Sequence, residues 1–566
     1  MNFLNVYKKW LESDLVDEIM KEELKEIKDN NLEIEDRFYK NLSFGTAGLR
    51  GKMGAGTNRM NCLVVAKTTQ AYANYLKKTF ACDIRVAIAY DSRNHSKEFA
   101  FYAAKILSAN GITVYIFDSL RPTPELSYAV RKLLANGGIN ITASHNPKEY
   151  NGYKVYNENG GQIIEAEAEA IMEEIDKLEF SDIIFDEKNE LIHIIDKELD
   201  SQFIDEVSNV LFDSNEDRQV KIVYNPLFGA GADIIPRTLK ENGFDNLFID
   251  EKMSIPNGDF PGLELPNPEF LEVYKSSVEL AFKNKADVVI ATDPDSDRIG
   301  VMAYSPFSKS YELLTGNEVG ALIIDYILHR LHKNGAIPDN AYIVNTIVTN
   351  NLGECIASNY GVKTFKTLTG FKYIADFIQR NHDENSKFLF GYEDTCGYLA
   401  HTEIRDKDAV QIALLVVEMA DYYKKRGRTL INVMREIYTK YGFVFDKTIS
   451  YKFDGILGKQ TIDKIMDFFR NTKPDVISGY KIVKLMDLDV SLSYDMVDGN
   501  VEKIELPKSN VMKFIFEDDS WVAVRPSGTE PKLKIYFSIV GENEKSVVEK
   551  YNSIYEGVSN LIRLEK

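Results

Sequence analysis

The chain has 566 residues, a formal net charge of −19 and 44% hydrophobic residues. Its length exceeds the roughly 250–300 residues at which a single core stops growing, so it must fold as several domains. Its acidic balance excludes a surface that attracts nucleic acid or anionic membranes, and an anionic substrate would need a local cluster of cations.

The N-terminal part predicts helix followed by parallel α/β structure. Residues 1–40 are expected to be helical, because Leu11, Leu15 and Ile19 recur at the spacing of one helix face. The next stretch, FGTAGLRGKMGAGTNRMN, is rich in glycine and is expected to be a loop. A buried strand over Ile84–Tyr90 then ends in a polar tip, and a helical stretch leads to the strand ITVYIFD. This order indicates a parallel α/β sheet.

The same pattern recurs further along the chain. Later strands run into glycine-rich or polar tips in QVKIVYNPLFGAGA, ADVVIATDPDSDRIGV, AYIVNTIVT and KFLFGYEDTCGY. Ligands of such sheets bind at the carboxyl ends of the strands. The acidic segment from Glu165 to Glu190 is interpreted as a solvated helix and connector. From about Thr429 short strands predominate, which predicts a smaller α+β domain.

A single serine lies at one of these strand ends, in ITASHNPKEYNGYK. Residues Ile139–Thr142 are expected to form a strand, and the Asn-Pro pair after His145 favours a turn that exposes the Ser144 hydroxyl. A serine surrounded by cations can relay a phosphoryl group, and Lys154 is a candidate cation. The alternatives are a turn serine that caps a helix and a histidine that only shapes the loop.

Three carboxylates follow the strand Val288–Ala291, in the sequence DPDSDR. We expect Asp293, Asp295 and Asp297 to point to one side of an extended loop, where they would repel one another without a cation. Oxygen ligands of this kind suit Mg²⁺ or Ca²⁺, and Mg²⁺ prefers a few carboxylates with a phosphate oxygen. Arg298 is expected to orient the aspartates or to contact a phosphate. The alternative is a solvated acidic turn.

Two more loops carry polar groups at strand ends. In GYEDTCGY, Glu393 and Thr395 are expected to point the same way and to hold sugar hydroxyls. Lys407, in EIRDKDAV, lies beside the start of an apolar helix. Taken alone, this segment has only the charge pattern that is typical of a helix start. The sequence RPSGTEPK lies between two strands and predicts a phosphate cradle, with a polar hairpin as the alternative. Its donors are Arg525, Ser527, Gly528, Thr529 and Lys532.

The cysteines and the hydropathy of the chain indicate the cellular compartment of the protein. The cysteines Cys62, Cys82, Cys355 and Cys396 form no C-x-x-C pair, so neither a zinc site nor a disulfide framework is indicated. The N-terminus lacks the apolar core of a signal peptide. The most apolar stretch of helix length, residues 409–420, is shorter than the ~20 residues of a membrane span. We therefore expect a cytoplasmic protein with no membrane or nucleic-acid partner.

In this order, the loops TASHNP, DPDSDR, GYEDTCGY and RPSGTEP resemble the phosphoserine, metal, sugar and phosphate-binding loops of the α-D-phosphohexomutase family. The resemblance extends from Gly45 to beyond Tyr536, and FGTAGLRG, GAGTNRMN and TGFKYI are most similar to its long phosphoglucomutase-2 and phosphopentomutase branch. It implies an α/β protein of three related mixed-sheet α/β domains and a C-terminal α+β domain around a central active-site cleft. The expected domains are residues 1–208, 209–310, 311–428 and 429–566.

The resemblance also implies the roles of the site residues. Ser144 would be phosphorylated, and its phosphate would hold Mg²⁺ together with Asp293, Asp295 and Asp297. Lys407 would be the acid–base lysine. The catalytic group would be completed by Arg50, His145 and Lys154. The substrate-binding residues would be Thr369, Gly370, Lys372, Glu393, Thr395, Arg298, Arg525, Ser527, Gly528 and Thr529. The family's common sugar loop has a second Glu and a Ser where this chain has Asp394 and Thr395, which leaves the sugar preference open.

The function implied by this resemblance is that of a phosphoglucomutase, which interconverts glucose 1-phosphate and glucose 6-phosphate and is primed by glucose 1,6-bisphosphate. The alternatives are phosphomannomutase or phosphopentomutase activity, a sugar-bisphosphate synthase or phosphatase, and a non-catalytic sugar-phosphate sensor. The expected partners are phosphorylated sugars, and the chain is expected to be a monomer or a weak homo-oligomer.

Overall fold

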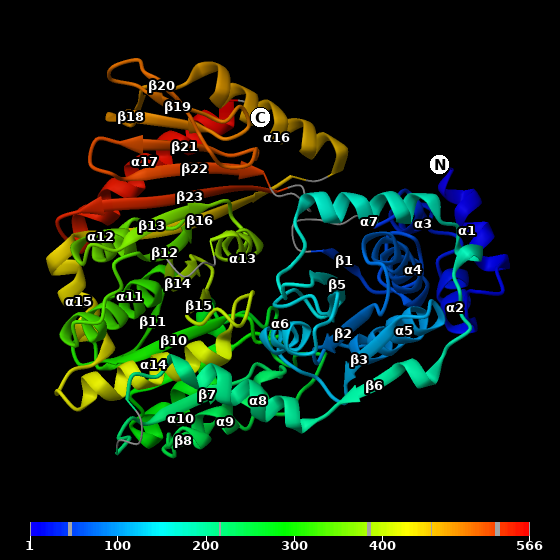
Figure 1. The fold of residues 1–566 in the computed structure, drawn as a ribbon. Coiled ribbons are helices and arrows are strands. Elements are labelled where there is room, and N and C mark those ends of the chain that lie inside the picture. The colour runs from blue at the N-terminus through cyan, green and yellow to red at the C-terminus, as the bar shows by residue number, and fades with distance from the viewer. Residues whose placement is uncertain are drawn as a thin grey trace. The chain divides into compact units, whose positions relative to one another are not determined.

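The computed structural model describes residues 2–42, 48–213, 217–381, 386–453, 455–526 and 532–564, and Figure 1 labels its helices and strands. The chain forms a first compact unit, Met1–Ile343 with Gly370–Ile431, and a second, Val344–Thr369 with Asn432–Lys566. Each unit is therefore built from two separate stretches of chain.

The N-terminal segment forms three short helices, α1 (Phe3–Glu12), α2 (Glu18–Glu26) and α3 (Asn31–Phe38). The predicted single apolar face is wrong, because Ile19 is 83% exposed and Leu15 is 38% exposed. The first helix ends at Glu12 with Ser13 as its C-cap, and this break interrupts the spacing on which the prediction relied. The buried side chains come instead from a different set, Tyr7, Trp10, Val16, Met20, Leu24, Ile34 and Phe38.

The first sheet is mixed and has six strands in the order β1-β5-β4-β2-β3-β6. β2 is parallel to β3 and β4, whereas β5 is antiparallel to β4 and β1. The strands are β1 (Leu49–Lys52), β2 (Arg85–Tyr90), β3 (Thr113–Phe117), β4 (Gly137–Ile141), β5 (Tyr150–Asn157) and β6 (Ile192–Ile195). The helices of this region are α4 (Cys62–Thr79), α5 (Ser96–Ala109), α6 (Thr123–Lys132), α7 (Glu165–Lys177) and α8 (Lys197–Val207), with the short η1 (Phe180–Asp182), η2 (Asn189–Leu191) and η3 (Ser208–Val210). Apolar side chains of β2 to β5 pack with those of α4, α5 and α7 in one core.

The second sheet is also mixed and has the strand order β11-β10-β9-β7-β8. Its strands are β7 (Ile222–Asn225), β8 (Leu247–Ile249), β9 (Val288–Thr292), β10 (Ile299–Ser305) and β11 (Ser310–Leu314). Its helical elements are α9 (Gly231–Glu241), η4 (Leu271–Tyr274) and α10 (Lys275–Asn284). β9 is parallel to β7 and antiparallel to β10, so the acidic loop is the connection at the carboxyl end of β9.

The next region contributes to both units. Helices α11 (Gly316–Lys333), α13 (Phe371–Arg380) and α14 (Ala409–Lys424) and strands β14 (Lys387–Glu393) and β15 (Gly397–Leu399) lie in the first unit. Helix α12 (Leu352–Asn359) and strand β13 (Lys363–Thr367) lie in the second, and β12 (Ala341–Thr346) runs from one unit into the other. β14 and β15 form an antiparallel hairpin. Helix α14 is the predicted apolar helix, is buried on all sides, and begins after the capping side chain of Asp408.

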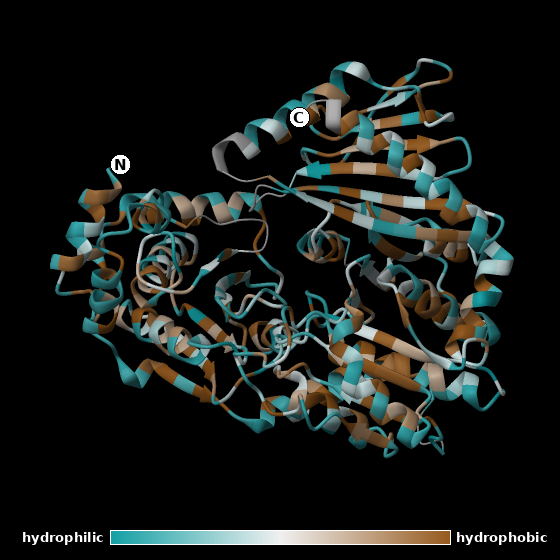
Figure 2. Cartoon of the chain, turned by 180° about the vertical axis from the view of Figure 1, so that it is seen from behind, coloured by the Kyte–Doolittle hydropathy of each residue, from teal (hydrophilic) through white to brown (hydrophobic). Residues whose placement is uncertain are grey.

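The C-terminal part of the second unit is an antiparallel sheet with helices. Its strand order is β16-β23-β22-β21-β18-β19-β20, with β17 paired to β18. The strands are β16 (Phe443–Lys452), β17 (Val476–Ile477), β18 (Tyr480–Asp487), β19 (Leu492–Asp495), β20 (Val501–Lys503), β21 (Met512–Phe516), β22 (Trp521–Pro526) and β23 (Lys532–Gly541). The helices are α15 (Leu430–Tyr441), α16 (Gly455–Thr472) and α17 (Glu544–Leu564). Hydrophobic and hydrophilic residues alternate along several of its long strands (Figure 2), as expected for a sheet with one buried face.

These elements confirm the expected fold class, which is mixed α/β sheets followed by an α+β C-terminal domain. The strands expected over Ile84–Tyr90 and Val288–Ala291 are observed as β2 and β9, each within one residue of the expected bounds. Within the described residues, we find no helix with the length and apolar character that a bilayer crossing demands.

Candidate active site

Ser144 lies just beyond the carboxyl end of β4 in a left-handed backbone conformation. Its φ is +50°, and its N–H donates to Thr142 Oγ1 at 2.8 Å. A residue with a side chain is strained in this conformation, so the surrounding structure has to hold it there. The Ser144 hydroxyl donates to Asp293 Oδ2 at 2.5 Å, and its oxygen lies 3.1 Å from His145 Nδ1. The turn therefore directs the serine hydroxyl towards the acidic loop.

The serine loop is held by the buried guanidinium of Arg93. Its Nη1 donates to the carbonyls of Pro147 at 2.8 Å and Tyr150 at 3.0 Å. Its Nη2 donates to the Ser144 carbonyl at 2.5 Å and also to the carbonyl of Asn146. Because all these acceptors are backbone atoms, Arg93 fixes the path of the loop and leaves the serine side chain available.

Asp91 connects the same loop to the end of β2. Its Oδ2 accepts from Thr142 Oγ1 at 2.6 Å, and its Oδ1 accepts from Ser96 Oγ at 2.6 Å and from the Arg93 N–H at 2.9 Å. Burial raises the pKa of the Asp91 carboxyl. Each oxygen of this carboxyl therefore has partners from the elements that surround the serine.

The three aspartates of the acidic loop meet in a tight turn between β9 and β10. One carboxylate oxygen from each of Asp293, Asp295 and Asp297 lies within 4.8 Å of the others. The predicted extended loop is wrong, because Ser296 has φ +50° and its N–H donates to the Asp293 carbonyl at 2.9 Å. The carboxylates converge because the chain turns, and alternation along a strand plays no part. Gly229 leaves room for the turn, since a Cβ there would lie 2.5 Å from the α-carbon of Pro294.

The aspartate cluster has the oxygen atoms that a cation needs. Oδ1 of Asp295 and Oδ1 of Asp297 are buried and have no hydrogen-bond partner among the described residues. Burial, together with the charges of the other two aspartates, raises the pKa of Asp293. Burial acts in the same direction on Asp297, but Lys407 and Lys154 hold the pKa of Asp297 below its usual range. Carboxylate oxygens without hydrogen-bond partners, close to other negative charges, are suitable ligands for a divalent metal ion.

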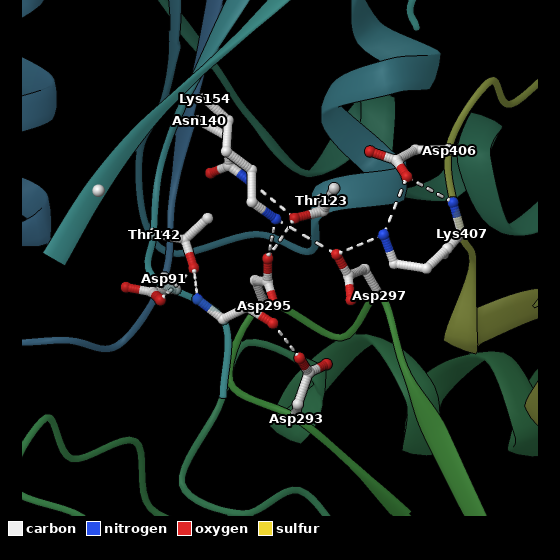
Figure 3. A network of polar contacts seen from close by, with 12 residues as sticks. Asp91, Thr123, Asn140, Thr142, Lys154, Asp293, Asp295, Asp297, Asp406 and Lys407 are labelled. Atoms are coloured by element: carbon white, nitrogen blue, oxygen red, sulfur yellow. Dashed lines mark hydrogen bonds and ion pairs between the residues drawn. The ribbon is translucent and has the colours of Figure 1, made fainter. Parts of the chain in front are cut away.

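Two buried lysines offset part of this negative charge (Figure 3). Lys154 Nζ lies 2.7 Å from Asp295 Oδ2 and 3.2 Å from Asp297 Oδ2, and Figure 3 shows it between these two carboxylates. Lys407 Nζ lies 3.1 Å from Asp297 Oδ2. Burial opposes the charged form of each lysine, but the carboxylates outweigh it and raise the pKa of both. Both lysines are therefore positively charged.

Lys407 is positioned by Asp406 and Gly397. Asp406 Oδ1 accepts from the Lys407 N–H at 2.8 Å and lies 3.3 Å from Lys407 Nζ. Asp406 Oδ2 accepts from the hydroxyl of Tyr156 at 2.8 Å. The lysine side chain passes so close to Gly397 that a Cβ there would lie 2.2 Å from Lys407 Cδ. The lysine thus has little freedom to leave the aspartate cluster.

Glu393 ends β14, and Thr395 lies in the hairpin turn that leads to β15. Glu393 Oε1 accepts from the Gly370 N–H at 2.9 Å, and burial raises the pKa of Glu393. The predicted alternation does not apply to Glu393 and Thr395, because the chain turns here and Cys396 has φ +59°. The Ile299 N–H donates to the Cys396 carbonyl at 3.1 Å, so the main chain joins this loop to the acidic loop.

The remaining predicted catalytic residues, Arg50 and His145, lie in or beside the serine loop, and Arg298, a predicted substrate-binding residue, lies in the acidic loop. Arg50 Nη1 donates to Asn146 Oδ1 at 3.4 Å. Arg298 Nε lies 3.9 Å from Asp297 Oδ1. Burial and the charges of Arg298 and Arg50 lower the pKa of His145, so its imidazole is neutral at physiological pH.

The remaining predicted substrate-binding residues are distributed over both units. Lys372, on α13, donates to Glu165 Oε1 at 2.8 Å. Thr369 belongs to the second unit, where its Oγ1 is buried without a hydrogen-bond partner among the described residues. Arg525 lies on β22 opposite Lys534 of β23. The predicted donors Ser527, Gly528 and Thr529 fall outside the described residues.

Sequence reasoning missed several residues that position the site. The N–H of Thr123, the first residue of α6, donates to the Asp295 carbonyl at 2.8 Å, and its Oγ1 donates to Asp295 Oδ2 at 2.9 Å. Asn140 Nδ2 donates to Thr123 Oγ1 at 2.6 Å (Figure 3). For Asp91 and Arg93 a signal existed, since they form the polar tip after β2. For Thr123 there is no comparable signal in the sequence.

The fold and the site define a class of protein, α/β proteins with a buried serine beside an acidic cluster that could hold a metal ion. Comparison with known proteins narrows this class. Family models for phosphoglucomutase/phosphomannomutase match the chain as α/β/α domain I over residues 41–182, domain II over 201–305, domain III over 315–441 and the C-terminal domain over 492–545. The chain belongs to the phosphoglucomutase/phosphomannomutase family, whose members are mutases, and this confirms both the expected phosphohexomutase family and the expected class of enzyme.

Curated relatives and solved structures agree with this assignment. The phosphoglucomutase of Staphylococcus saprophyticus is 36% identical over 92% of this chain and 94% of its own length. A Staphylococcus aureus phosphoglucomutase is 35% identical over 93% of this chain and 94% of its own length. The open form of the Paramecium phosphoglucomutase parafusin has a TM-score of 0.66 at 18% identity, covering 93% of this chain and 96% of its own. At that identity the structural match supports the fold alone.

Proposed function

We propose that this protein is a phosphoglucomutase that interconverts glucose 1-phosphate and glucose 6-phosphate through a phosphorylated Ser144. The relatives that carry this activity in their names match nearly the whole chain. The observation that carries the proposal is the contact of the Ser144 hydroxyl with Asp293, inside a buried cluster of acids and lysines. A serine held there can accept a phosphoryl group where its charge is compensated and water is largely excluded.

We further propose that the acidic cluster holds Mg²⁺. The open Oδ1 atoms of Asp295 and Asp297, an oxygen of Asp293 and the phosphate on Ser144 would be its ligands. When bound, the ion would neutralise charge on the transferred phosphoryl group.

The protein residues then carry the remaining steps. A sugar hydroxyl oxygen attacks the phosphorus of phospho-Ser144, the bond from Ser144 Oγ to phosphorus breaks, and a sugar bisphosphate forms. The attacking hydroxyl loses its proton and the departing Ser144 oxygen gains one, and we assign Lys407 and its neighbours to this proton exchange. Lys154 stays beside Asp295 and Asp297. The bisphosphate turns over, and its other phosphoryl group returns to Ser144. Glucose 1,6-bisphosphate would therefore prime an unphosphorylated enzyme.

The other predicted residues keep their proposed roles. Glu393 and Thr395 would bind sugar hydroxyls, and Arg50, His145 and Arg298 would surround the transferred phosphate. The proposed binding residues for the rest of the substrate are Thr369, Gly370, Lys372, Arg525, Ser527, Gly528 and Thr529. We also propose the domain division at residues 208, 310 and 428 and a cleft shared by the four domains. The four free cysteines agree with a cytoplasmic location, and we expect a monomer or a weak homo-oligomer.

A coupled assay tests the proposal. Purified protein is given glucose 1-phosphate, mannose 1-phosphate or ribose 1-phosphate with Mg²⁺ and a bisphosphate primer, alongside Ser144→Ala. We expect the highest kcat/KM for glucose 1-phosphate and no measurable conversion by Ser144→Ala. Undiminished conversion by Ser144→Ala would contradict the serine relay. Accumulation of bisphosphate or release of inorganic phosphate without isomerisation would instead identify a synthase or a phosphatase.

A further inference from the structure

A small cavity lies beside the chain segment that carries Lys407, separate from the aspartate cluster. Its volume is about 50 Å³. Its polar lining residues include Asn157, Asn159, Gln162, Gln379 and Arg405. The cavity wall is therefore rich in hydrogen-bond donors.

Arg405, which lines this cavity, is a buried cation. It is 1% exposed, and it forms no ion pair among the residues that the structure describes. Its Nε donates to Gln379 Oε1 at 3.3 Å and its Nη1 to the Ile404 carbonyl at 3.5 Å, both long contacts. Its Nη2 has no hydrogen-bond partner within the described part of the chain. Burial and the nearby Arg131 lower the pKa of Arg405 to about 10, which leaves it charged at neutral pH. A buried charge in this state is unfavourable unless something compensates it.

The acidic groups near the cavity are bound elsewhere. Asp376 lines the cavity, but its Oδ2 lies 2.6 Å from Arg380 Nη2. Glu403 Oε2 lies 3.0 Å from Arg131 Nη2. The charge of Glu403 still acts on Arg405 from a distance, but neither carboxylate forms an ion pair with its guanidinium.

We propose that this cavity is a binding site for a small inorganic anion of the size of chloride, nitrate or bicarbonate, held by Arg405 Nη2 and the amide N–H groups around it. A water needs roughly 10–15 Å³ of such space, so a cavity of about 50 Å³ accommodates an ion of this size. It is far smaller than the roughly 300–1,000 Å³ of sites for larger ligands, so a sugar phosphate does not fit. The proposal goes beyond the mutase reaction and does not depend on it.

The cavity is connected to the lysine of the candidate active site. Arg405 directly precedes Asp406 and Lys407, whose contact is drawn in Figure 3. From the cavity wall, Gln162 Nε2 donates to the Tyr156 hydroxyl at 3.4 Å, which in turn donates to Asp406 at 2.8 Å. A bound anion would therefore fix the segment that places Lys407.

The test titrates nitrate into the full-length protein, with glutamate as the bulky replacement anion at constant ionic strength. We expect the midpoint temperature of thermal unfolding to rise by about 2 °C when the nitrate concentration is ten times its Kd. Gln379→Glu is nearly isosteric and places an internal carboxylate beside Arg405 Nε, so its midpoint should no longer depend on nitrate. Gln460→Glu, an exposed change of the same charge on α16, should respond as the wild type does. A wild type without a nitrate response, or an equal response in Gln379→Glu, would overturn the proposal.

Crystals grown in bromide give a second measurement that does not depend on a variant. We expect an anomalous peak within hydrogen-bond distance of Arg405 Nη2. A cavity without such a peak, at a bromide concentration that saturates the thermal response, would also overturn the proposal.

Discussion

The side chain of Lys407 crosses Gly397 so closely that a β-carbon at Gly397 would lie 2.2 Å from Lys407 Cδ and 2.9 Å from Lys407 Cγ. A methyl group at this position cannot be accommodated without moving the lysine. We therefore expect Gly397→Ala to reduce kcat by about 100-fold, because displacement of a catalytic group by about 1 Å has an effect of this size. Steady-state kinetics with glucose 1-phosphate measure the change.

Gly161→Ala is the matched control for this prediction. Its added Cβ would meet no atom closer than 3.6 Å, so kcat should stay within about twofold of the wild type. A Gly397→Ala enzyme with normal kcat would show that Lys407 does not need the position observed here.

Arg93→Lys is expected to loosen the serine loop. A lysine cannot reproduce the several fixed N–H directions with which Arg93 binds the carbonyls of Ser144, Pro147 and Tyr150. Leaving buried acceptors without partners costs about 1–3 kcal/mol each, so the unfolding midpoint should fall by several degrees. Phosphorylation of Ser144 by glucose 1,6-bisphosphate, measured by intact-protein mass spectrometry, should slow by at least about tenfold.

The control for Arg93→Lys is Arg237→Lys, at a partly exposed arginine that pairs with Glu241. Surface ion pairs contribute about 0–1 kcal/mol, so this variant should unfold near the wild-type temperature. If both variants behaved alike, the serine loop would not depend on Arg93.

Asp295→Asn is expected to weaken metal binding. The change removes negative charge at an oxygen that is open for a cation, while Lys154 remains beside it. The Mg²⁺ concentration for half-maximal activity should rise at least about tenfold, and calorimetry should show the same loss of affinity. EDTA should abolish wild-type activity, and added Mg²⁺ should restore it.

Asp233→Asn, an exposed change in the first turn of α9, is the control for this prediction. Its Mg²⁺ dependence should match the wild type. Unchanged Mg²⁺ dependence in Asp295→Asn would remove Asp295 from the proposed ligands.

Asp408, the cap of α14, gives the fold a pH dependence. Burial raises the pKa of its carboxyl to about 6 from a usual value of 3.8. Because the folded state binds this proton more tightly than the unfolded state, the contribution is fully present below about pH 4 and is lost as the pH rises through 6. The change is about 3 kcal/mol of unfolding free energy.

Asp408→Asn isolates this contribution, since asparagine does not titrate. The free energy of unfolding of the wild type minus that of the variant, measured in urea, should fall by about 2.4 kcal/mol between pH 4 and pH 7. A difference that is constant over this range would contradict the raised pKa.

The strands and the loops they carry could be predicted because their signals are local. The stretch Ile84–Tyr90 is apolar except for Arg85, the run Val288–Ala291 is wholly apolar, and both end in polar residues. Both strands and the position of the acidic loop could therefore be predicted from the sequence. The N-terminal prediction failed at Ser13, because the helix is broken there and residues on the two sides of the break do not share one helix face.

The supporting contacts could not be predicted because they join distant parts of the chain. Thr123 and Asp295 are 172 residues apart, and Arg93 lies 51 residues before the serine that it holds. No periodicity or motif records such a pairing. The two turns with positive φ, at Ser144 and Ser296, were also outside the reach of spacing arguments, because serine does not signal this conformation as glycine would.

The contact between Ser144 and Asp293 has a consequence for the order in which the site forms during translation. The two residues are 149 positions apart, so a ribosome working at 5–20 residues per second needs about 7 to 30 s to add the second after the first. During that interval the nascent chain already carries Ser144, the proposed nucleophile, but not Asp293 or the aspartates that follow it. A newly made molecule should therefore be unable to take up its first phosphate until translation has passed well beyond the first sheet.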